Sequence, residues 1–392
     1  MMKKTSIDRR KFLQLGVTGA ASLAATTAAV ASPSPLPDAE KDKINFRTLG
    51  KTGIRVPVVS MGVMRADNPN ILKAAYQSGI TFFDTAHGYQ EGRNEEMVGN
   101  FFEDKPRDSF VLATKIHPGK GTSKEKFLEM LDLSLKRLKM DFVDILYLHA
   151  ADDSQYLYNE DYIGALKTAK EQGKVKHVGF STHRNMAGMI NTALERGFYE
   201  VILTSYNFRL ANDEEMTNAL QRAHDAGIGL VGMKNMAGGW LDEAKTKKVN
   251  AKAALKWALS NPCIHTCIPG IVSFEMLLEN WSVAGDIALL PEEKEDLQLA
   301  LREPGMFCTG CNSCSGQCVH GLPVSDLMRS YMYNYAYAYP AKAWQTVVET
   351  GISDNPCGDC EECTVTCKSG FDVRRRITNI ARIKTVPAEF LV

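Results

Sequence analysis

Four ionisable side chains in the first half of the chain stand at, or just after, the ends of short apolar runs. The run Thr81–Asp84 ends in an aspartate, and Tyr89 follows five residues later. Two later runs end in Lys115 and His149. Short apolar runs bounded by turn residues are typical of buried strands. Because ionisable groups at successive strand ends are hard to explain by packing, these positions predict a shared functional site.

Eight of the ten cysteines form two runs near the C-terminus, each with the spacing C-x2-C-x2-C-x3-C. The first run is Cys308, Cys311, Cys314 and Cys318, and the second is Cys357, Cys360, Cys363 and Cys367. This spacing resembles that of bacterial ferredoxins with two [4Fe–4S] clusters. In those proteins the fourth cysteine of a run ligates the other cluster. The resemblance therefore implies that Cys367 completes the first set and Cys318 completes the second.

Two other uses of these cysteines stay open. Structural zinc sites also contain C-x2-C pairs, and disulfides occur in exported proteins; the regular spacing favours clusters over both. Val319 and Lys368 replace the proline that usually follows the fourth cysteine. The pattern over Leu322–Ala336 predicts a helix, and so a helical ferredoxin-like module. Cys263 and Cys267 lie outside both runs and are expected to be core thiols.

The composition is that of a large globular protein without a nucleic-acid surface. The chain has 392 residues, 44% of them hydrophobic, and its 46 basic residues balance 46 acidic ones. This length accommodates one barrel with an appendage. Binding to nucleic acid requires a basic face, which a net charge of zero does not indicate.

The first residues resemble a twin-arginine export signal. Ser6–Gln14 contains the arginine pair, Leu15–Val30 is weakly apolar, and Ala29–Ala31 is a small-x-small cleavage site. We expect a signal peptide at 1–31 that the twin-arginine translocase recognises, a linker at 32–44, and a periplasmic location in a bacterium. The short run, rich in Ala and Thr, does not favour a membrane anchor, and no nearby cysteine offers a lipid anchor. A basic, disordered N-terminus is the alternative.

From about Asn45 onward, strand-like runs alternate with helical patterns. After a short hairpin at Phe46–Ile54, the expected strands are Val56–Met61, Thr81–Asp84, Phe110–Lys115, Val143–His149, Val175–Phe180, Val201–Ser205, Gly229–Met233 and His265–Ile268. The expected helices lie at 72–77, 94–102, 124–138, 162–172, 186–196, 213–226, 251–260 and 274–283. Eight such units predict parallel strands in an α/β fold, a (β/α)8 TIM barrel over 45–302. A small, mainly helical iron–sulfur domain is expected over 303–392.

The barrel segment resembles the aldo-keto reductase family over about residues 45–300. The matching segments are Phe83–Ala86 with Tyr89, Ala113–Lys115, Ser134–Leu138, Asp141–Asp144, Leu148–His149, Val178–Ser181, Ile268–Gly270 and Glu279–Asn280. The resemblance implies an oxidoreductase that interconverts a carbonyl and an alcohol. It also implies a catalytic tetrad formed by Asp84, Tyr89, Lys115 and His149.

The chemistry of such a tetrad follows from its side chains. A phenol titrates near 10, too high for acid–base work at neutral pH. The ammonium of Lys115 is expected to lower that pKa, and Asp84 would hold and orient Lys115. His149 would hydrogen-bond the substrate oxygen. Tyr89 would then give a proton to a carbonyl oxygen as hydride reaches the carbon, or remove it in the reverse reaction. The alternative for any one of these residues is a structural role.

The resemblance also implies a nicotinamide dinucleotide, NAD(P)(H). Its matching binding residues are Ser181, Asn207, Lys234, Gly270, Ser273, Glu279 and Asn280. Phosphate would be held by backbone N–H groups at a helix N-terminus. Met276 stands where many members carry the Arg or Gln that binds a 2′-phosphate, so no preference for NADP is expected. A solvated surface lysine is the alternative for Lys234.

Three hypotheses for the function follow. The first is an exported aldo-keto reductase-like enzyme that exchanges electrons through nicotinamide, through two [4Fe–4S] clusters, or through both, with a redox protein as a possible partner. The second is an electron-transfer or binding subunit whose barrel is not catalytic. The third is a metal-stabilised barrel with a sugar-binding site, which zinc analysis would support. Five tyrosines at alternate positions of 331–339 are expected to pack against the barrel or a partner.

Overall fold

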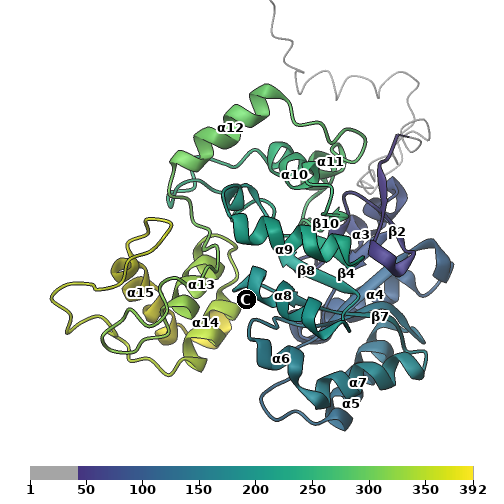
Figure 1. Ribbon diagram of the computed structural model, residues 1–392, viewed down its shortest axis with the longest axis horizontal. Coiled ribbons are helices and arrows are strands. Elements are labelled where there is room, and N and C mark those ends of the chain that lie inside the picture. Colours follow the sequence, from purple (N-terminus) through teal and green to yellow (C-terminus); the bar gives the residue numbers. More distant parts are fainter. Residues whose placement is uncertain (1–42, 392) are drawn as a thin grey trace, which may run out of the picture. The chain divides into compact units, whose positions relative to one another are not determined.

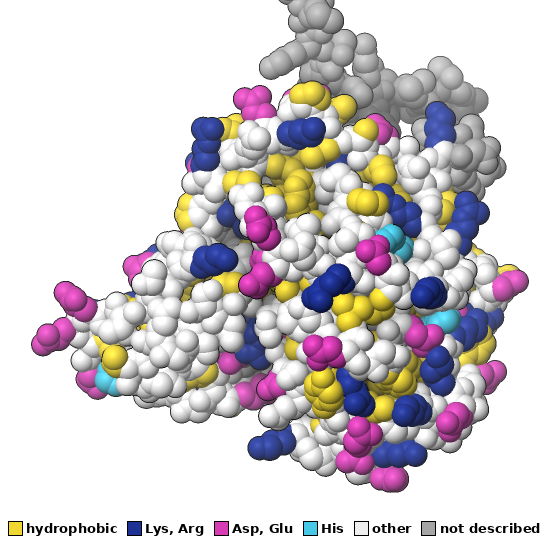
Figure 2. All heavy atoms as spheres, viewed as in Figure 1, with side chains coloured by type: hydrophobic (Ala, Val, Ile, Leu, Met, Phe, Trp, Pro, Cys, Tyr) yellow, Lys and Arg dark blue, Asp and Glu magenta, His cyan; other side chains and the backbone are white. Residues whose placement is uncertain are grey.

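Residues 43–391 are described by the computed structural model, and they lie within one compact unit. The expected signal peptide at 1–31 and most of the expected linker at 32–44 lie outside the described residues. Among residues 43–391, no helix is both long and apolar enough to cross a bilayer. On the face shown in Figure 2, basic side chains lie among acidic ones, as the balanced composition predicts.

Eight parallel strands form the barrel (Figure 1). In sheet order they are β3 (Met61–Gly62), β4 (Phe82–Asp84), β5 (Val111–Ile116), β6 (Val143–Leu148), β7 (Val175–Thr182), β8 (Val201–Ser205), β9 (Gly229–Met233) and β10 (Thr266–Cys267). Parallel bridges from Val59 to Cys267 and from Gly62 to Gly270 connect the first strand to the last. The (β/α)8 barrel predicted from the sequence is therefore confirmed.

The helices surround this sheet (Figure 1). They are α3 (Pro69–Ser78), α4 (Arg93–Phe102), α5 (Lys124–Leu138), α6 (Ser154–Tyr158), α7 (Glu160–Glu171), α8 (Met186–Arg196), α9 (Glu214–Asp225), α10 (Ala251–Ser260), α11 (Phe274–Trp281) and α12 (Pro291–Arg302). In α5, Ser123 caps the first turn by accepting from the Lys126 N–H. Phe127, Leu131 and Leu135, spaced four apart, are buried on one face. That spacing places one apolar stripe against the sheet.

The expected first strand, Val56–Met61, is wrong as a single element. Val56 lies in β2 (Arg55–Pro57), which pairs antiparallel with β1 (Phe46–Thr48) outside the barrel. Pro57 has no N–H to continue a ladder, and the chain joins the barrel after it, first through the bridge from Val59 to Cys267 and then through β3 from Met61. The hairpin also brings Leu49 against Gly229, where a Cβ would lie 2.6 Å from the Leu49 side chain. Leu49 therefore fills the barrel end at the strand N-termini.

The C-terminal region is helical, as expected. Its helices are α13 (Val324–Tyr335), α14 (Pro340–Glu349) and α15 (Val373–Ala381), and α13 contacts both others. The apolar core of these helices continues into three residues of the barrel region. Phe208 follows β8, Ala237 follows β9 and Ala254 lies on α10. The region thus packs on the loops at the C-terminal ends of barrel strands.

Candidate active site and cysteine cavities

Three of the predicted site residues, Asp84, Lys115 and His149, point into the barrel because side chains alternate along the strands. Phe82, Ala113 and Tyr147 are buried in the apolar cluster that fills the interior. Side chains on a strand repeat with a period of two. Asp84 and Lys115 therefore point inward at the C-terminal ends of β4 and β5, and His149 follows β6 in the same phase.

Lys115 connects the predicted tetrad. Its ammonium donates to the Asp84 carboxylate at 2.5 Å, to the Thr85 carbonyl at 2.6 Å and to the Tyr89 hydroxyl at 3.3 Å. Lys115 is 2% exposed. The Tyr89 and His149 rings meet edge to face with centroids 5.6 Å apart. The structure thus brings all four side chains together, with Tyr89 and His149 partly exposed.

The pKa of Tyr89 moves opposite to the direction expected from the sequence. Burial raises the pKa of Tyr89 above its usual value, and Lys115 only partly offsets that effect. Burial alone would lower the pKa of Lys115, but Asp84 and Tyr89 hold it above its usual value. The phenol is therefore protonated at neutral pH, beside an ammonium that stabilises the phenolate left after proton transfer.

His149 is held neutral. Burial lowers the pKa of His149 well below its usual value, and the charges of Lys115 and other nearby cations act in the same direction. A neutral imidazole carries one N–H donor, which suits a hydrogen bond to a substrate oxygen.

The pH profile of carbonyl reduction should show this neutral state. Because His149 is already deprotonated at pH 7, kcat should not change between about pH 6 and pH 8 through titration of a histidine near 6.5. Reduction should weaken only at alkaline pH, as Tyr89 loses its proton. A pH–rate profile checks both limbs, and a step in kcat near pH 6.5 would contradict the assignment of His149.

The loop that carries Tyr89 is held by residues that sequence reasoning did not assign to the site. The Thr85 hydroxyl donates to the side-chain amide oxygen of Asn94 at 2.6 Å. Arg137 donates to the His87 carbonyl at 3.0 Å and to the buried Glu95 carboxylate at 3.4 Å. These side chains come from α4 and α5. The sequence did contain a sign of this role for Glu95, because Glu95 falls on the face of the predicted helix that must be buried.

The residues predicted to bind a dinucleotide fall into two groups. Gly270, Ser273, Glu279 and Asn280 lie in the turn after β10 and in α11. The Ser273 hydroxyl accepts from the Met276 N–H and caps α11, and a Cβ at Gly270 would meet no atom within 4 Å. A capped helix N-terminus beside an open turn is suited to a phosphate. This group therefore fits the phosphate-bearing end of a dinucleotide.

The second group, Ser181, Asn207 and Lys234, is already engaged within the protein. The Ser181 hydroxyl accepts from the Ala150 N–H at 2.9 Å, and the Asn207 amide donates to the Lys234 carbonyl at 3.2 Å. The Lys234 ammonium lies 5.4 Å and 4.9 Å from the ring centroids of Tyr333 and Tyr337. Lys234 is therefore not the solvated surface lysine that the sequence left open, because the C-terminal region covers it.

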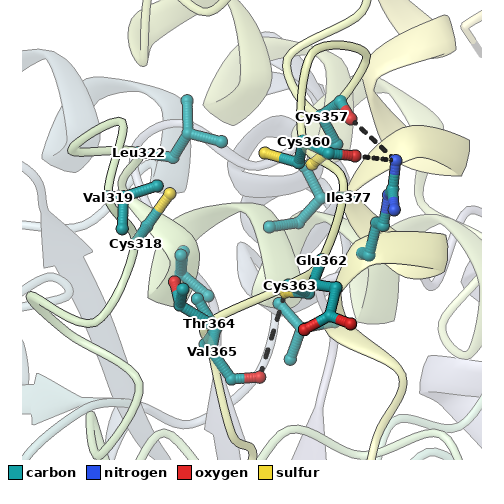
Figure 3. Close-up of a pocket in the computed structure, with 13 residues that line it drawn as sticks. Cys318, Val319, Leu322, Cys357, Cys360, Glu362, Cys363, Thr364, Val365 and Ile377 are labelled. Atoms are coloured by element: carbon teal, nitrogen blue, oxygen red, sulfur yellow. Dashed lines mark hydrogen bonds between the residues drawn. The ribbon is translucent and has the colours of Figure 1, made fainter.

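The eight clustered cysteines line two cavities in crossed sets. Cys308, Cys311 and Cys314 share the first cavity with Cys367 from the second run. The second cavity is lined by Cys318, Cys357, Cys360 and Cys363 (Figure 3). In each cavity, three cysteines from one run face a single cysteine from the other, which is the grouping implied by the ferredoxin resemblance.

A basic side chain braces the second cavity. The Arg374 guanidinium donates to the carbonyls of Cys360, Glu361 and Cys357, the last two at 2.9 Å and 3.4 Å. The bonds to Cys360 and Cys357 are drawn in Figure 3. Arg374, at the start of α15, thereby holds the backbone of the second cysteine run around the cavity. The two cavities adjoin, since Val373 lines both.

All ten cysteines are free in this structure, and Cys263 and Cys267 are buried beside β10 as core thiols. Within residues 43–391, no three or more His, Cys, Asp or Glu side chains are grouped so as to hold a metal ion.

Comparison with known proteins agrees with the fold. The profile described as "Aldo/keto reductase family" matches residues 59–252. An uncharacterized oxidoreductase of Bacillus subtilis (strain 168) is 30% identical over 53% of this chain and 71% of that protein. The chain belongs to the aldo-keto reductase family. It is an oxidoreductase of the aldo-keto reductase type.

Other known proteins match over similar spans. L-galactose dehydrogenase of Arabidopsis thaliana is 27% identical over 65% of this chain and 92% of its own length. The solved holo form of an aldo-keto reductase from Bacillus halodurans superposes with a TM-score of 0.55 at 22% identity, over 66% of this chain and 96% of that one. The family profile ends at residue 252, before both cysteine runs.

Proposed function

We propose that this protein is an exported iron–sulfur aldo-keto reductase that interconverts a carbonyl and an alcohol of a small metabolite. The observation that carries the proposal is the set of contacts made by Lys115, whose ammonium bonds to Asp84 and reaches the hydroxyl of Tyr89. In this proposal Tyr89 is the acid and base, and His149 positions the substrate oxygen.

The proton transfer follows from the site geometry. In the direction of reduction, the protonated Tyr89 hydroxyl gives its proton to the carbonyl oxygen as the carbon receives a hydride. Lys115 stabilises the resulting phenolate, and Asp84 keeps the ammonium in place. Oxidation of an alcohol runs through the same atoms in reverse, so it requires the ionised phenol and becomes faster as pH rises.

The hydride donor proposed for this reaction is a nicotinamide dinucleotide. Gly270 and Ser273 would hold its phosphates at the N-terminus of α11, with Glu279 and Asn280 on the same helix. The cofactor would supply or accept the hydride at the carbon opposite Tyr89. Met276 lies in the first turn of α11, where it offers no charge to a 2′-phosphate, so we propose no preference for NADP.

The proposal assigns one [4Fe–4S] cluster to each cysteine cavity. The kind and number of side chains support this assignment, since four cysteines line each cavity and thiolates are the usual ligands of such clusters. Cys308, Cys311, Cys314 and Cys367 would hold one cluster, and Cys318, Cys357, Cys360 and Cys363 the other. These clusters would supply one-electron chemistry and a route to a redox partner protein.

Export by the twin-arginine translocase into the periplasm belongs to the same proposal. The export proposal rests on the sequence of residues 1–31 alone. The proposed domains that follow are a linker at 32–44, a barrel domain at 45–302 and an iron–sulfur domain at 303–392. Because that route carries folded proteins, it is compatible with cofactors that are inserted before export.

One observation favours the alternative of an electron-transfer subunit with a non-catalytic barrel. The side chains of Ser181 and Asn207, two of the residues expected to bind a dinucleotide, are bonded within the protein. A titration of the reconstituted protein with NADH separates the two functions. Saturable binding supports the reductase, and the electron-transfer subunit predicts none.

Anaerobic purification tests the proposal as a whole. The expected protein contains about eight iron and eight sulfide ions per chain, as two clusters require, and no zinc. It should also reduce members of a panel of small aldehydes and ketones with NADH or with a reduced viologen dye. Protein that lacks iron and sulfide contradicts the cluster assignment, and iron-loaded protein without turnover contradicts the reductase.

A further inference from the structure

Three cationic side chains from separate parts of the chain lie near His149 or its neighbour His183. Lys234 follows β9, Arg329 lies in α13 and Lys342 lies in α14. Both lysines are close enough to His149 for their charges to contribute to its lowered pKa. Lys234 and Arg329 act in the same way on the neighbouring His183. Two of the three cations belong to the C-terminal region, so the barrel alone does not form this cluster.

Arg329 and Lys234 share one aromatic ring. Arg329 is 5% exposed, and it donates to the His183 carbonyl at 2.7 Å and to the Tyr333 hydroxyl. The Arg329 guanidinium carbon and the Lys234 nitrogen each lie 5.4 Å from the centroid of the Tyr333 ring. Two like charges at such a site repel each other, although Tyr333, Asp152 and Cys308 hold the pKa of Arg329 above its usual value against the effect of burial.

The backbone at Lys234 is in an unusual conformation. Its φ angle is 56°, in the left-handed region that residues other than glycine seldom adopt. Such a conformation persists where the surrounding structure enforces it, and it is frequent at functional sites. Here it turns the chain just after β9, where the Lys234 side chain meets the C-terminal region near the tetrad.

The nearby carboxylates offset the charge of the cluster only in part. Asp152 accepts from the Thr182 hydroxyl and from the N–H groups of His183 and Arg184, and it pairs with Arg184 at 3.5 Å. Two further carboxylates nearby are Asp326, which also pairs with Arg184, and the exposed Glu349, whose charge acts on Lys342. Burial and Arg329 lower the pKa of Lys234 to about 7, although Asp152 opposes them.

We propose that Lys234 binds the anionic group of the substrate, with Arg329 as a positioning residue and Lys342 adding positive charge from α14. This inference rests on the proposed function, because the reacting carbon would lie at Tyr89 and His149. The substrate is then an oxo acid or a hydroxy acid. Its anionic group is a carboxylate or a phosphate, whose oxygen atoms accept charge-assisted hydrogen bonds from the Lys234 ammonium.

The C-terminal region is therefore part of the substrate site as well as a carrier of cysteines. Tyr339, between α13 and α14, is near enough to Tyr89 to contribute to its raised pKa. Its N–H donates to the Tyr333 carbonyl at 2.9 Å. The same segment thus approaches both the acid–base residue and the cationic cluster, which places the anion subsite on the side of the tetrad that faces the C-terminal region.

Equilibrium binding of pyruvate and methyl pyruvate to the purified holoprotein tests the subsite without turnover. The two probes share a carbonyl, and only pyruvate has a charge. Pyruvate should bind about tenfold more tightly or better, and Lys234→Met should raise its Kd about tenfold or more without changing that of methyl pyruvate. Lys342→Met should raise the pyruvate Kd in the same direction, and Lys234→Arg should restore most of the loss. Lys252→Met, an exposed change on α10, is the control and should change neither Kd.

Equal binding of the two probes, or no saturable binding of pyruvate, overturns the subsite. A parallel NADH titration tests whether Lys234 instead binds a phosphate of the dinucleotide. If Lys234→Met weakens NADH binding and leaves pyruvate binding intact, Lys234 serves a dinucleotide phosphate and the inference is wrong. Tyr89→Phe should keep pyruvate binding. If no carbonyl is turned over but pyruvate binding still depends on Lys234, the proposed function fails and the subsite stands.

Discussion

Replacement of Tyr89 by phenylalanine should lower kcat for carbonyl reduction by a factor of about 10²–10⁴ while leaving substrate binding nearly unchanged. The change deletes one oxygen atom, the one that Lys115 reaches at 3.3 Å. Removal of a positioned general acid costs this much in other enzymes. The measurement is steady-state kinetics on the anaerobically purified protein, with kcat and KM determined separately.

Tyr158→Phe is the matched control for that experiment. Tyr158 is 44% exposed, and its hydroxyl donates to the exposed Glu195 at 3.3 Å. Loss of this hydroxyl should leave kcat within about twofold of the wild type, as expected for an exposed group outside the site. If Tyr89→Phe behaves like Tyr158→Phe, Tyr89 is not the acid, and the barrel belongs to the non-catalytic alternative.

Loss of Cys367 should affect the same cluster as loss of Cys311, although the two lie in different runs. Cys311→Ala and Cys367→Ala should each reduce iron from about eight toward about four per chain and remove the same electron paramagnetic resonance signal. The double variant should lose no more iron than either single variant. The physical reason is that both thiols line the first cavity.

Cys318→Ala is the discriminating variant. It should remove the signal that Cys360→Ala removes, and its combination with Cys367→Ala should abolish nearly all the iron. Cys263→Ala, a buried thiol outside both runs, should keep the full iron content. If Cys318→Ala instead removes the signal lost in Cys311→Ala, each cluster is held by a single run and the crossed sets are wrong.

The positions of the four tetrad residues could be predicted from local sequence patterns. Apolar runs that end in Asp84, Lys115 and His149 mark strand ends, and parallel strands place those ends at one edge. The barrel, and hence their proximity, was predictable for that reason. The first strand was not, because a hydrophobic run with Pro57 near its start can belong to a hairpin or to the barrel, and only pairing partners decide between them.

The direction of the Tyr89 pKa shift needed the tertiary structure. A lysine nearby lowers the pKa of a phenol, and burial raises it. The sequence contains the lysine but not the degree of burial, nor the charge effect of Tyr339, far along the chain, which also raises this pKa. The surroundings of Glu95 also needed the tertiary structure, because its carboxylate accepts hydrogen bonds from Thr114 and Arg137 on neighbouring elements.

The sequence by itself determined the fold family, the four candidate catalytic residues and the eight clustered cysteines, because short-range spacing and strand ends encode them. Only the tertiary structure decided which cysteines share a cavity and how the C-terminal region meets the barrel. Those features depend on contacts between residues more than a hundred positions apart, such as Lys234 with Tyr337 and Arg329 with His183. Local patterns do not specify such contacts, since they form when whole elements pack.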